Sequence, residues 1–150
     1  MNPKRNPVGW FEIYVDDKLT GKARREARAE AEGLEADAKQ ARAEAKGGTS
    51  WVVLDTDAVM TAVWAEMLHG GQDPYFARLN HIADHYLVPD IDLRWVDDGL
   101  RYFGQSDIRR RFMDMATAEL DKRRIPYALV RGQGEARVKS AIEALRGLAG

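Results

Sequence analysis

The chain has 150 residues, and its 23 Lys and Arg against 24 Asp and Glu give a formal charge of −1. No overall basic field therefore points to nucleic acid or to an anionic membrane as a partner. The absence of cysteine excludes a disulfide framework and a Cys-based zinc site. No apolar run approaches the roughly 20 residues of a membrane helix and no signal-peptide pattern is seen, which predicts a cytoplasmic protein with one domain, or one domain plus an appendage.

The first predicted element is a strand at 9–15. Residues 8–17 read VGWFEIYVDD and are rich in β-branched and aromatic side chains. This wording resembles the first strand of glyoxalase/bleomycin-resistance (vicinal oxygen chelate) domains. The resemblance would place Glu12 at a metal position, but a single Glu on a strand is more often a solvated residue. The further metal ligands of such domains do not follow in the sequence.

Residues 18–46 form a predicted exposed helix. Their composition shifts to Ala, Glu, Lys and Arg, which are good helix formers. Leu34 is almost the only large apolar residue, so the pattern predicts a solvated, partly frayed helix that is interrupted near Gly33. Residues 47–50, GGTS, end this segment as a hinge or linker.

A short apolar run, WVVL, opens a predicted strand at 51–55. An apolar run that is followed by an acidic residue matches the Walker B pattern, in which the strand would hold Asp55 at the sheet edge near Mg²⁺. Asp57 also stands at the N-cap position of the next helix, and we weigh capping and catalytic roles equally for it. The amphipathic spacing of 58–69, closed by Gly70, predicts that helix.

Residues 72–84 are predicted as a short helix that leads to a strand at 86–90. His81 and His85 lie four residues apart, which would place two imidazoles on one helix face. Neither a Glu in the metalloprotease arrangement nor an evident third ligand accompanies them. We therefore interpret the two histidines as structural rather than as metal ligands.

The stretch from Asp90 to Phe112 gathers a Trp, acids, arginines and glycines directly after the strand at 86–90. A strand–loop–helix order places this cluster at the carboxyl edge of the predicted sheet. Open α/β folds bind their ligands at that edge, and loops present side chains to ligands. The stretch therefore points to a ligand site, with a phosphorylated ligand as the leading interpretation.

The last third of the chain predicts a helix at 107–124, a strand at 127–131 and a helix at 135–148. Ser106 or Asp107 would cap the first of these helices. Its core stripe would contain Ile108, Phe112, Met115, Ala116 and Leu120, and the last helix would face inward with Val138, Ile142 and Leu145. Together the elements predict an α/β fold of three layers with a mostly parallel sheet, and whether the strand at 9–15 joins that sheet is left open.

Residues 51–150 together resemble the carboxyl portion of the P-loop ATPase and kinase family of NAD metabolism, typified by the ribosylnicotinamide kinase domain of NadR-like proteins. The resemblance rests on LDTDAVMTAVWAEMLHG, DIDLRWVDDGLRYFG, Arg109-x-x-Phe112 and PYALVRGQGEAR. It implies a fold of the P-loop nucleoside triphosphate hydrolase type, ATP and Mg²⁺ as cofactors, and phosphoryl transfer to a small-molecule nucleoside. Arg94, where the family often has Pro, is a departure from the pattern.

The resemblance also implies catalytic roles. Asp55 would hold Mg²⁺ through water, and Asp57 would accept the proton of the ribose hydroxyl. Arg101 and Arg109 would belong to the lid that closes on the ATP phosphates, where they would supply positive charge to the transferring group.

The remaining implied roles concern binding. Trp95, Asp97, Asp98 and Arg101 would bind the substrate nucleoside, and Gly132 and Gly134 would pass close to adenine. A simpler interpretation stays open for part of this set, in which Trp95 is a hydrophobic plug and the two acids are neutralised by neighbouring arginines.

The amino-terminal part departs from the family because the sequence contains no G-x-x-x-x-G-K-[ST] string. The nearest segment, DDKLTGKA at 16–23, keeps Gly21 and Lys22 as candidate nucleotide-binding residues but has Asp16 for the first Gly and Ala23 for the Mg²⁺-binding hydroxyl. Carboxylates would then face the triphosphate, which predicts weak or absent ATP binding.

This departure also divides the predicted chain. Residues 1–17 form a strand of uncertain origin, 18–50 an exposed helix with a linker, and 51–150 the kinase-like portion, as in a chimera with an atypical or truncated amino terminus.

The sequence leaves three functions open. The first is a nucleoside kinase of NAD salvage or its inactive relic, and the second is a non-catalytic interaction protein on a degenerate kinase fold. The third is a metal-dependent glyoxalase-like protein, which the missing metal ligands disfavour. The oligomeric state is not predicted.

Overall fold

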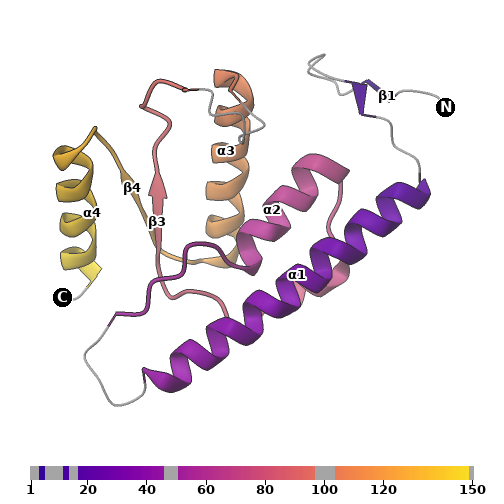
Figure 1. Ribbon diagram of the computed structural model, residues 1–150, viewed down its shortest axis with the longest axis horizontal. Helices are drawn as coiled ribbons and strands as arrows, with labels where there is room; N and C mark the ends of the chain where they lie inside the picture. Colours follow the sequence, from indigo (N-terminus) through magenta and orange to yellow (C-terminus); the bar gives the residue numbers. More distant parts are fainter. Residues whose placement is uncertain (1–3, 6–11, 14–16, 46–50, 97–103, 149–150) are drawn as a thin grey trace. The chain divides into compact units, whose positions relative to one another are not determined.

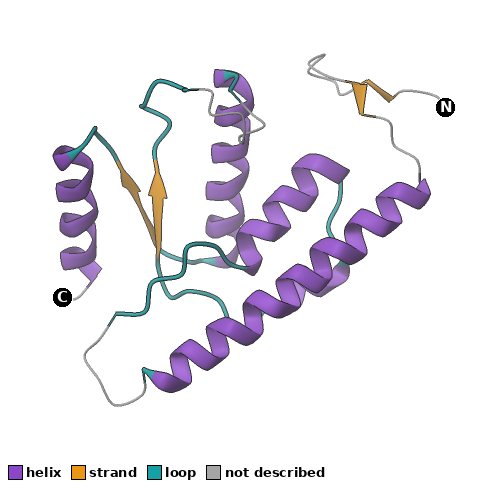
Figure 2. Cartoon of the chain, in the orientation of Figure 1, coloured by secondary structure: helices purple, strands orange, loops and turns teal. Residues whose placement is uncertain are grey.

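The computed structural model describes residues 4–5, 12–13, 17–45, 51–96 and 104–148. The chain divides into two compact units, Met1–Ile82 and Ala83–Gly150. Figure 1 shows the elements in chain order and Figure 2 their types. The first unit contains β1 (Lys4–Arg5), β2 (Glu12–Ile13), α1 (Asp17–Glu44), α2 (Ala58–His69) and the short 3-10 helix η1 (Pro74–Arg78). The second contains β3 (Tyr86–Pro89), α3 (Ser106–Arg123), β4 (Tyr127–Val130) and α4 (Glu135–Leu148).

The first predicted strand appears only in part. Glu12–Ile13 form β2, which pairs antiparallel with β1 in the register Lys4↔Ile13 and Arg5↔Glu12. Residues 9–11 and 14–15 of the prediction lie outside the described residues. Among the residues that the structure describes, β2 therefore belongs to a small antiparallel pair rather than to the parallel sheet.

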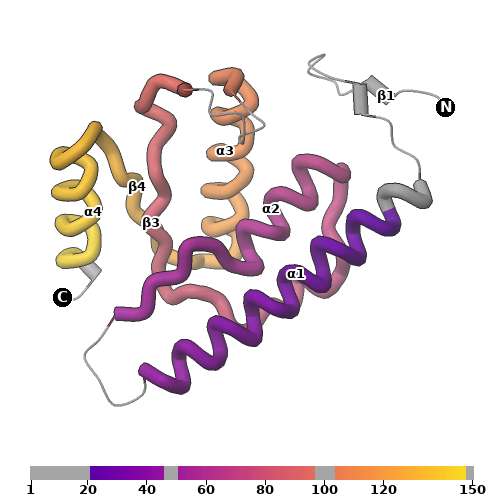
Figure 3. The backbone as a smooth tube through the Cα atoms, in the orientation of Figure 1, coloured from indigo at the N-terminus to yellow at the C-terminus, as the bar shows by residue number. Residues whose placement is uncertain are grey.

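Helix α1 is continuous and better packed than the sequence predicts. It is one helix of 28 residues, and Gly33 does not interrupt it. It packs along α2 (Figure 3), and the small side chains of Ala31 and Ala38 are only 0% and 2% exposed. Residues seven apart share one helix face, and alanines there let two helices approach closely. The prediction of a loosely held helix was wrong because it counted only large apolar residues.

The prediction for α2 is confirmed at both ends. The Asp57 carboxylate accepts hydrogen bonds from the amides of Val59 and Met60, at 3.0 and 3.1 Å. Gly70 closes the helix in the left-handed conformation at φ 66°, and its N–H donates to the Glu66 carbonyl. The apolar face of α2 forms much of the core of this unit, whose largest fully buried side chains are Phe76, Val59 and Val63.

Replacing Asp57 by Ala is expected to destabilise the protein by about 1 kcal/mol, because an N-cap carboxylate satisfies amides that the helix leaves unpaired. The measurement is urea unfolding followed by circular dichroism. Asp55→Ala is the matched control, since Asp55 is exposed and lies two residues away. Equal unfolding midpoints for the two variants would contradict the capping role.

The predicted strand at 51–55 is wrong. Residues 51–55 have no strand geometry, and Trp51 and Val53 are 57% and 85% exposed. Val and Trp favour strands only when a neighbouring strand pairs with them. No strand therefore places Asp55 at the edge of a sheet, which the Walker B interpretation requires.

The predicted helix at 72–84 shrinks to η1. Asp73 caps it by accepting from the Tyr75 amide, and beyond it the amides of Asn80 and His81 donate to Glu35 of α1 instead of continuing the helix. His81 lies in a bend and His85 directly precedes β3, so they do not share a helix face. Within the described ranges no group of three or more His, Cys, Asp or Glu residues is placed to hold a metal ion.

The second unit is built on a parallel pair, β3 and β4, in the register from Tyr86↔Tyr127 to Pro89↔Val130. This confirms the two last predicted strands and their parallel order. The predicted three-layer arrangement with a wider sheet is not confirmed, because the parallel sheet in the described part of the chain has two strands.

The helices of the second unit correct details of the prediction. Gln105 precedes α3 with no side-chain cap, so neither Ser106 nor Asp107 is its N-cap. The α3 core side is Ile108, Met113, Ala116 and Leu120, with the predicted Phe112 and Met115 half-buried.

Helix α4 has the predicted bounds and packs on β4, but its inward face was mispredicted. Val138 and Ile142 are 59% and 43% exposed, whereas Leu145 is half-buried. A sheet of two strands covers less of a helix than a wide one, so part of the apolar stripe stays open. No helix in the part of the chain that the structure describes is long and apolar enough to cross a membrane.

Candidate functional site

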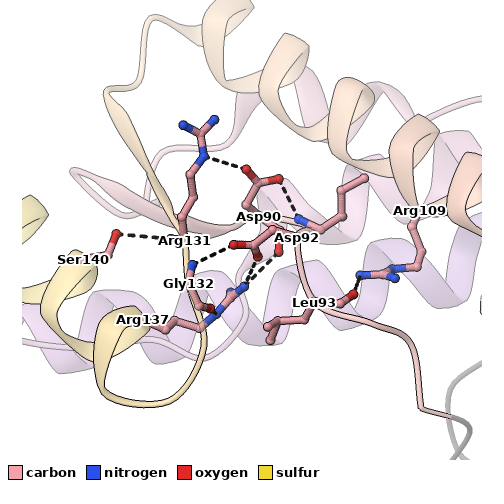
Figure 4. A network of polar contacts seen from close by, with 9 residues as sticks. Asp90, Asp92, Leu93, Arg109, Arg131, Gly132, Arg137 and Ser140 are labelled. Atoms are coloured by element: carbon pink, nitrogen blue, oxygen red, sulfur yellow. Dashed lines mark hydrogen bonds and ion pairs between the residues drawn. The ribbon is translucent and has the colours of Figure 1, made fainter.

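Polar side chains gather at the carboxyl ends of β3 and β4 (Figure 4). Asp90 follows β3, and its N–H extends the ladder by donating to the Val130 carbonyl at 2.9 Å. Its Oδ2 accepts from Nε of Arg131, the first residue after β4, at 2.7 Å. The hydrogen bond from Arg131, together with that from the Ile91 amide, holds the pKa of the Asp90 carboxyl below its usual value. Asp90 is therefore a fixed, ionised group at this edge.

A second carboxylate joins the two loops that follow the strands. Asp92 Oδ2 accepts from the Gly132 amide at 2.7 Å, and its Oδ1 accepts from Nη2 of Arg137 on α4. Arg137 also donates from Nε to the Gly132 carbonyl at 2.8 Å and from Nη2 to the Asp90 carbonyl at 3.3 Å. The loop after β3 is thus tied to the turn between β4 and α4 (Figure 4).

The turn between β4 and α4 needs glycine at residue 132. Gly132 has φ 92°, and a Cβ there would lie 3.1 Å from the Ala136 Cβ. Gly134, at φ 55°, also occupies the left-handed region. These conformations leave the Gly132 amide uncovered by a side chain of its own, so an oxygen can approach it closely.

Trp95 lies close to an arginine and a glycine. The Arg109 guanidinium carbon lies 5.7 Å from the Trp95 ring centroid, and Arg109 Nη2 donates to the Leu93 carbonyl at 3.2 Å. A Cβ on Gly104 would lie 2.5 Å from the Trp95 indole nitrogen, so only glycine fits there. The ring is half-buried, which is compatible with both predicted roles, a hydrophobic plug and a nucleoside-stacking surface.

Among the described residues that interact at this edge, arginines outnumber acids. Arg110 is close enough that its charge contributes to the lowered pKa of Asp90, after the hydrogen bonds from Arg131 and the Ile91 amide. The local set is Arg109, Arg110, Arg131 and Arg137 against Asp90 and Asp92. An excess of arginine favours anions, and phosphates above all.

The predicted site residues do not all lie in the same unit of the structure. Trp95, Arg109, Gly132 and Gly134 lie in the second unit, around the edge just described. Asp55 and Asp57 lie in the first unit, where Asp55 is exposed and Asp57 is the buried cap of α2. Asp97, Asp98 and Arg101 lie outside the described residues.

Gly21 and Lys22 do not form a phosphate-binding loop. Both lie inside α1, which begins at Asp17, and Lys22 Nζ is 3.6 Å from Glu26 Oε1. Amides within a helix donate to its own carbonyls, so they cannot cradle phosphates as a P-loop does. Their predicted nucleotide contact is therefore without geometric support.

Sequence reasoning overlooked Asp92, Arg131 and Arg137. One signal was present, since Arg137 stands in the first turn of a helix that begins at Glu135. A positive charge in the first turn interacts unfavourably with the helix dipole, so a nearby anion is expected to offset that interaction. Which carboxylate would supply that anion depends on strand register, which the sequence did not reveal.

Comparison with known protein families identifies the family of the chain. The model of the AAA domain family matches residues 11–137. The chain belongs to this AAA domain family. Members are P-loop-type nucleoside triphosphatases that generally use ATP and Mg²⁺, so the chain is an ATPase- or kinase-like domain of that kind. No solved structure matches it.

The family result bears on the predicted boundaries. The match spans the residues assigned to a separate helix and linker as well as those assigned to the kinase-like portion. The division at residues 17 and 50 and the foreign origin of the amino terminus stay predictions. The resemblance to glyoxalase domains gains no support from the comparison.

The residues present fit phosphates better than they fit a metal ion. Asp55 is a single exposed carboxylate, and Asp57 Oδ1 is taken by helix amides. No cluster of metal-binding residues was found among the described positions. Mg²⁺ in nucleotide sites is held largely by phosphates and water, so these residues provide no all-protein cage for it.

Proposed function

We propose that the chain is an ATP-binding kinase-like domain of NAD salvage, of the ribosylnicotinamide kinase type, in which arginines at the carboxyl edge of β3 and β4 make the principal phosphate contacts. The observation that supports this is the arginine-rich edge, with a Gly132 amide that already donates to a carboxylate, in a member of the AAA domain family. Without a P-loop string, binding is weak, as the sequence predicts.

The proposed roles follow from the chemistry of each group. Arg109 and Arg137 supply charge and directed N–H groups to phosphate oxygens. Trp95 presents a ring face that stacks a nucleoside, with Arg109 above it. The roles of Asp55, at Mg²⁺ through water, and of Asp57, as acceptor of the hydroxyl proton, rest on the resemblance alone. In the proposed reaction, the γ-phosphoryl group passes from ATP to a ribosyl hydroxyl.

The test is calorimetric titration of ATP with Mg²⁺ into the wild type, Arg109→Gln and the control Arg146→Gln. Arg146 is exposed in the last turn of α4, so its loss changes the charge equally. We expect saturable binding with a Kd on the order of 0.1 to 1 mM, weakened by roughly tenfold in Arg109→Gln and unchanged in the control.

A phosphorylation assay with ribosylnicotinamide and labelled ATP then separates the alternatives. Transfer of label to the nucleoside supports the kinase. ATP binding without transfer supports an inactive relic. No ATP binding by a protein that unfolds cooperatively would contradict the proposal and favour a non-catalytic interaction protein, with Val138 and Ile142 of α4 as exposed contact residues.

A further inference from the structure

The Asp92 carboxylate is bound in the way that proteins bind a phosphoryl group. One oxygen accepts from the Gly132 backbone amide and the other from the Arg137 guanidinium. A backbone amide in a glycine turn and an arginine fork are a recurrent donor pair for tetrahedral oxyanions. Here that donor pair is satisfied by an anion from the chain itself.

We propose that Asp92 is an internal stand-in for a phosphoryl group and that it must leave the Gly132–Arg137 donor pair before a polyphosphate can bind there. The proposal rests on the proposed function for the identity of the natural ligand, a nucleoside triphosphate. The carboxylate and the phosphoryl group exclude one another, because both need the same N–H groups.

The loop around Asp92 can move enough for a phosphoryl group to replace the Asp92 carboxylate. Asp90 is fixed by the ladder hydrogen bond to Val130 and by Arg131, so the chain is anchored up to that residue. Asp92 lies two residues further on, in the loop that follows β3, and its side chain is 32% exposed. Rotation just after Asp90 releases Asp92 to water without disturbing β3. Arg137 keeps its hydrogen bonds to the carbonyls of Gly132 and Asp90, so it stays in place.

The exchange also explains why an acid stands at an edge rich in arginine. While Asp92 occupies the donors, it repels an arriving phosphate and satisfies N–H groups that would otherwise be unpaired. A ligand with more negative charge and more acceptor oxygens than a carboxylate outcompetes it. The apparent affinity is reduced by the fraction of molecules in which Asp92 is bound.

The experiment titrates tripolyphosphate, without nucleoside or Mg²⁺, into the wild type, Asp92→Asn and Asp107→Asn. The Asn at 92 keeps the shape but weakens the hold on Arg137, so we expect about tenfold tighter binding. Asp107 is exposed in the first turn of α3, and its replacement removes the same charge without touching the donor pair. It should change the affinity by less than about twofold. Equal affinities for all three proteins would overturn the proposal.

A second readout does not depend on any variant folding. In the wild type, tripolyphosphate should shift the Gly132 amide resonance in a proton–nitrogen NMR spectrum, with the Arg137 Nε–H signal moving at the same ligand concentration. Shifts that spare both groups would overturn the proposal.

A parallel titration with ATP and Mg²⁺ separates the two ideas. If tripolyphosphate binds with the expected dependence on Asp92 but ATP with Mg²⁺ binds no better and is not turned over, the exchange stands and the proposed kinase function fails. If ATP binds equally well to the wild type and Asp92→Asn, the function stands and the exchange fails.

Discussion

Replacing Glu35 by Ala is expected to lower the free energy of unfolding by about 3 kcal/mol, because hydrogen bonds to a charged group contribute more than neutral ones. Glu35 stands on α1 and reaches the segment after α2. Its Oε1 accepts from the amides of Asn80 and His81, at 2.7 and 3.0 Å, and its Oε2 accepts from the Tyr75 hydroxyl. Loss of the carboxylate leaves these donors to water and frees the end of η1 from α1.

The pH dependence of this effect has a definite sign. Burial of the Glu35 carboxyl acts to raise its pKa, but the hydrogen bonds from the His81 amide, the Tyr75 hydroxyl and the Asn80 amide outweigh burial, and the pKa lies below its ordinary value. A carboxyl with a lowered pKa in the folded state stabilises the fold above its unfolded pKa, about 4.3 for Glu. That stabilisation is lost as the pH falls through the folded pKa. The difference between wild type and Glu35→Ala should therefore shrink in acid.

Tyr75 supplies a second check on the same contact. Burial and the hydrogen bond to Glu35 raise the pKa of Tyr75 to about 12, so its hydroxyl stays a donor throughout the neutral range. Tyr75→Phe removes that one donor, so it should cost less than Glu35→Ala, about 1 kcal/mol.

Urea unfolding at pH 7 and at acidic pH measures these differences. Glu30→Ala is the matched control, because Glu30 is exposed on the same helix and carries the same charge. A Glu35→Ala variant as stable as Glu30→Ala at pH 7, or a difference that grows in acid, would contradict the role assigned to the carboxylate.

Local signals explain which elements were predictable. The bounds of α2 follow from Asp57 as N-cap and Gly70 as a left-handed end, and both lie directly beside the segment that they delimit. The Gly132-Gln-Gly134 turn likewise marks the start of α4. Such signals depend on a few neighbouring residues, so one sequence suffices to find them.

Pairing between distant segments explains what was missed. The run at 51–55 has the composition of a strand, but a strand needs a partner that local composition does not reveal. The burial of Ala31 and Ala38 on a helix that packs along α2 depends on how the helices cross rather than on side-chain size. The lesson for α1 is that a helix rich in charge can still be packed through its alanines.

The candidate site shows the same limit. The sequence located the stretch after β3 and selected Trp95, Arg109 and the Gly132 turn. Arg109 and Gly132 lie close to the network at the carboxyl ends of β3 and β4 (Figure 4), and Arg109 lies over the Trp95 ring. The Asp92–Arg137 pair joins residues 45 apart in the chain. It appears only once the parallel register of β3 and β4 brings the two loops together.

Replacing Arg137 by Gln is expected to weaken tripolyphosphate binding by about a hundredfold, close to 2.7 kcal/mol, because a directed charge-assisted contact at a partly buried site is lost. The Arg137 side chain is 20% exposed, so water compensates only in part. Binding should no longer saturate at about 10 mM ligand.

Two further variants separate the causes of that loss. Arg137→Lys keeps the charge but lacks the planar fork that contacts Asp92 and the Gly132 carbonyl together, so it should recover only part of the affinity. Arg131→Gln removes a more exposed arginine that is paired with Asp90, and its effect should be smaller, about threefold. If Arg131→Gln abolished binding while Arg137→Gln left it intact, phosphate would be held by the outer arginine, and the Gly132 turn would serve only to join the two loops.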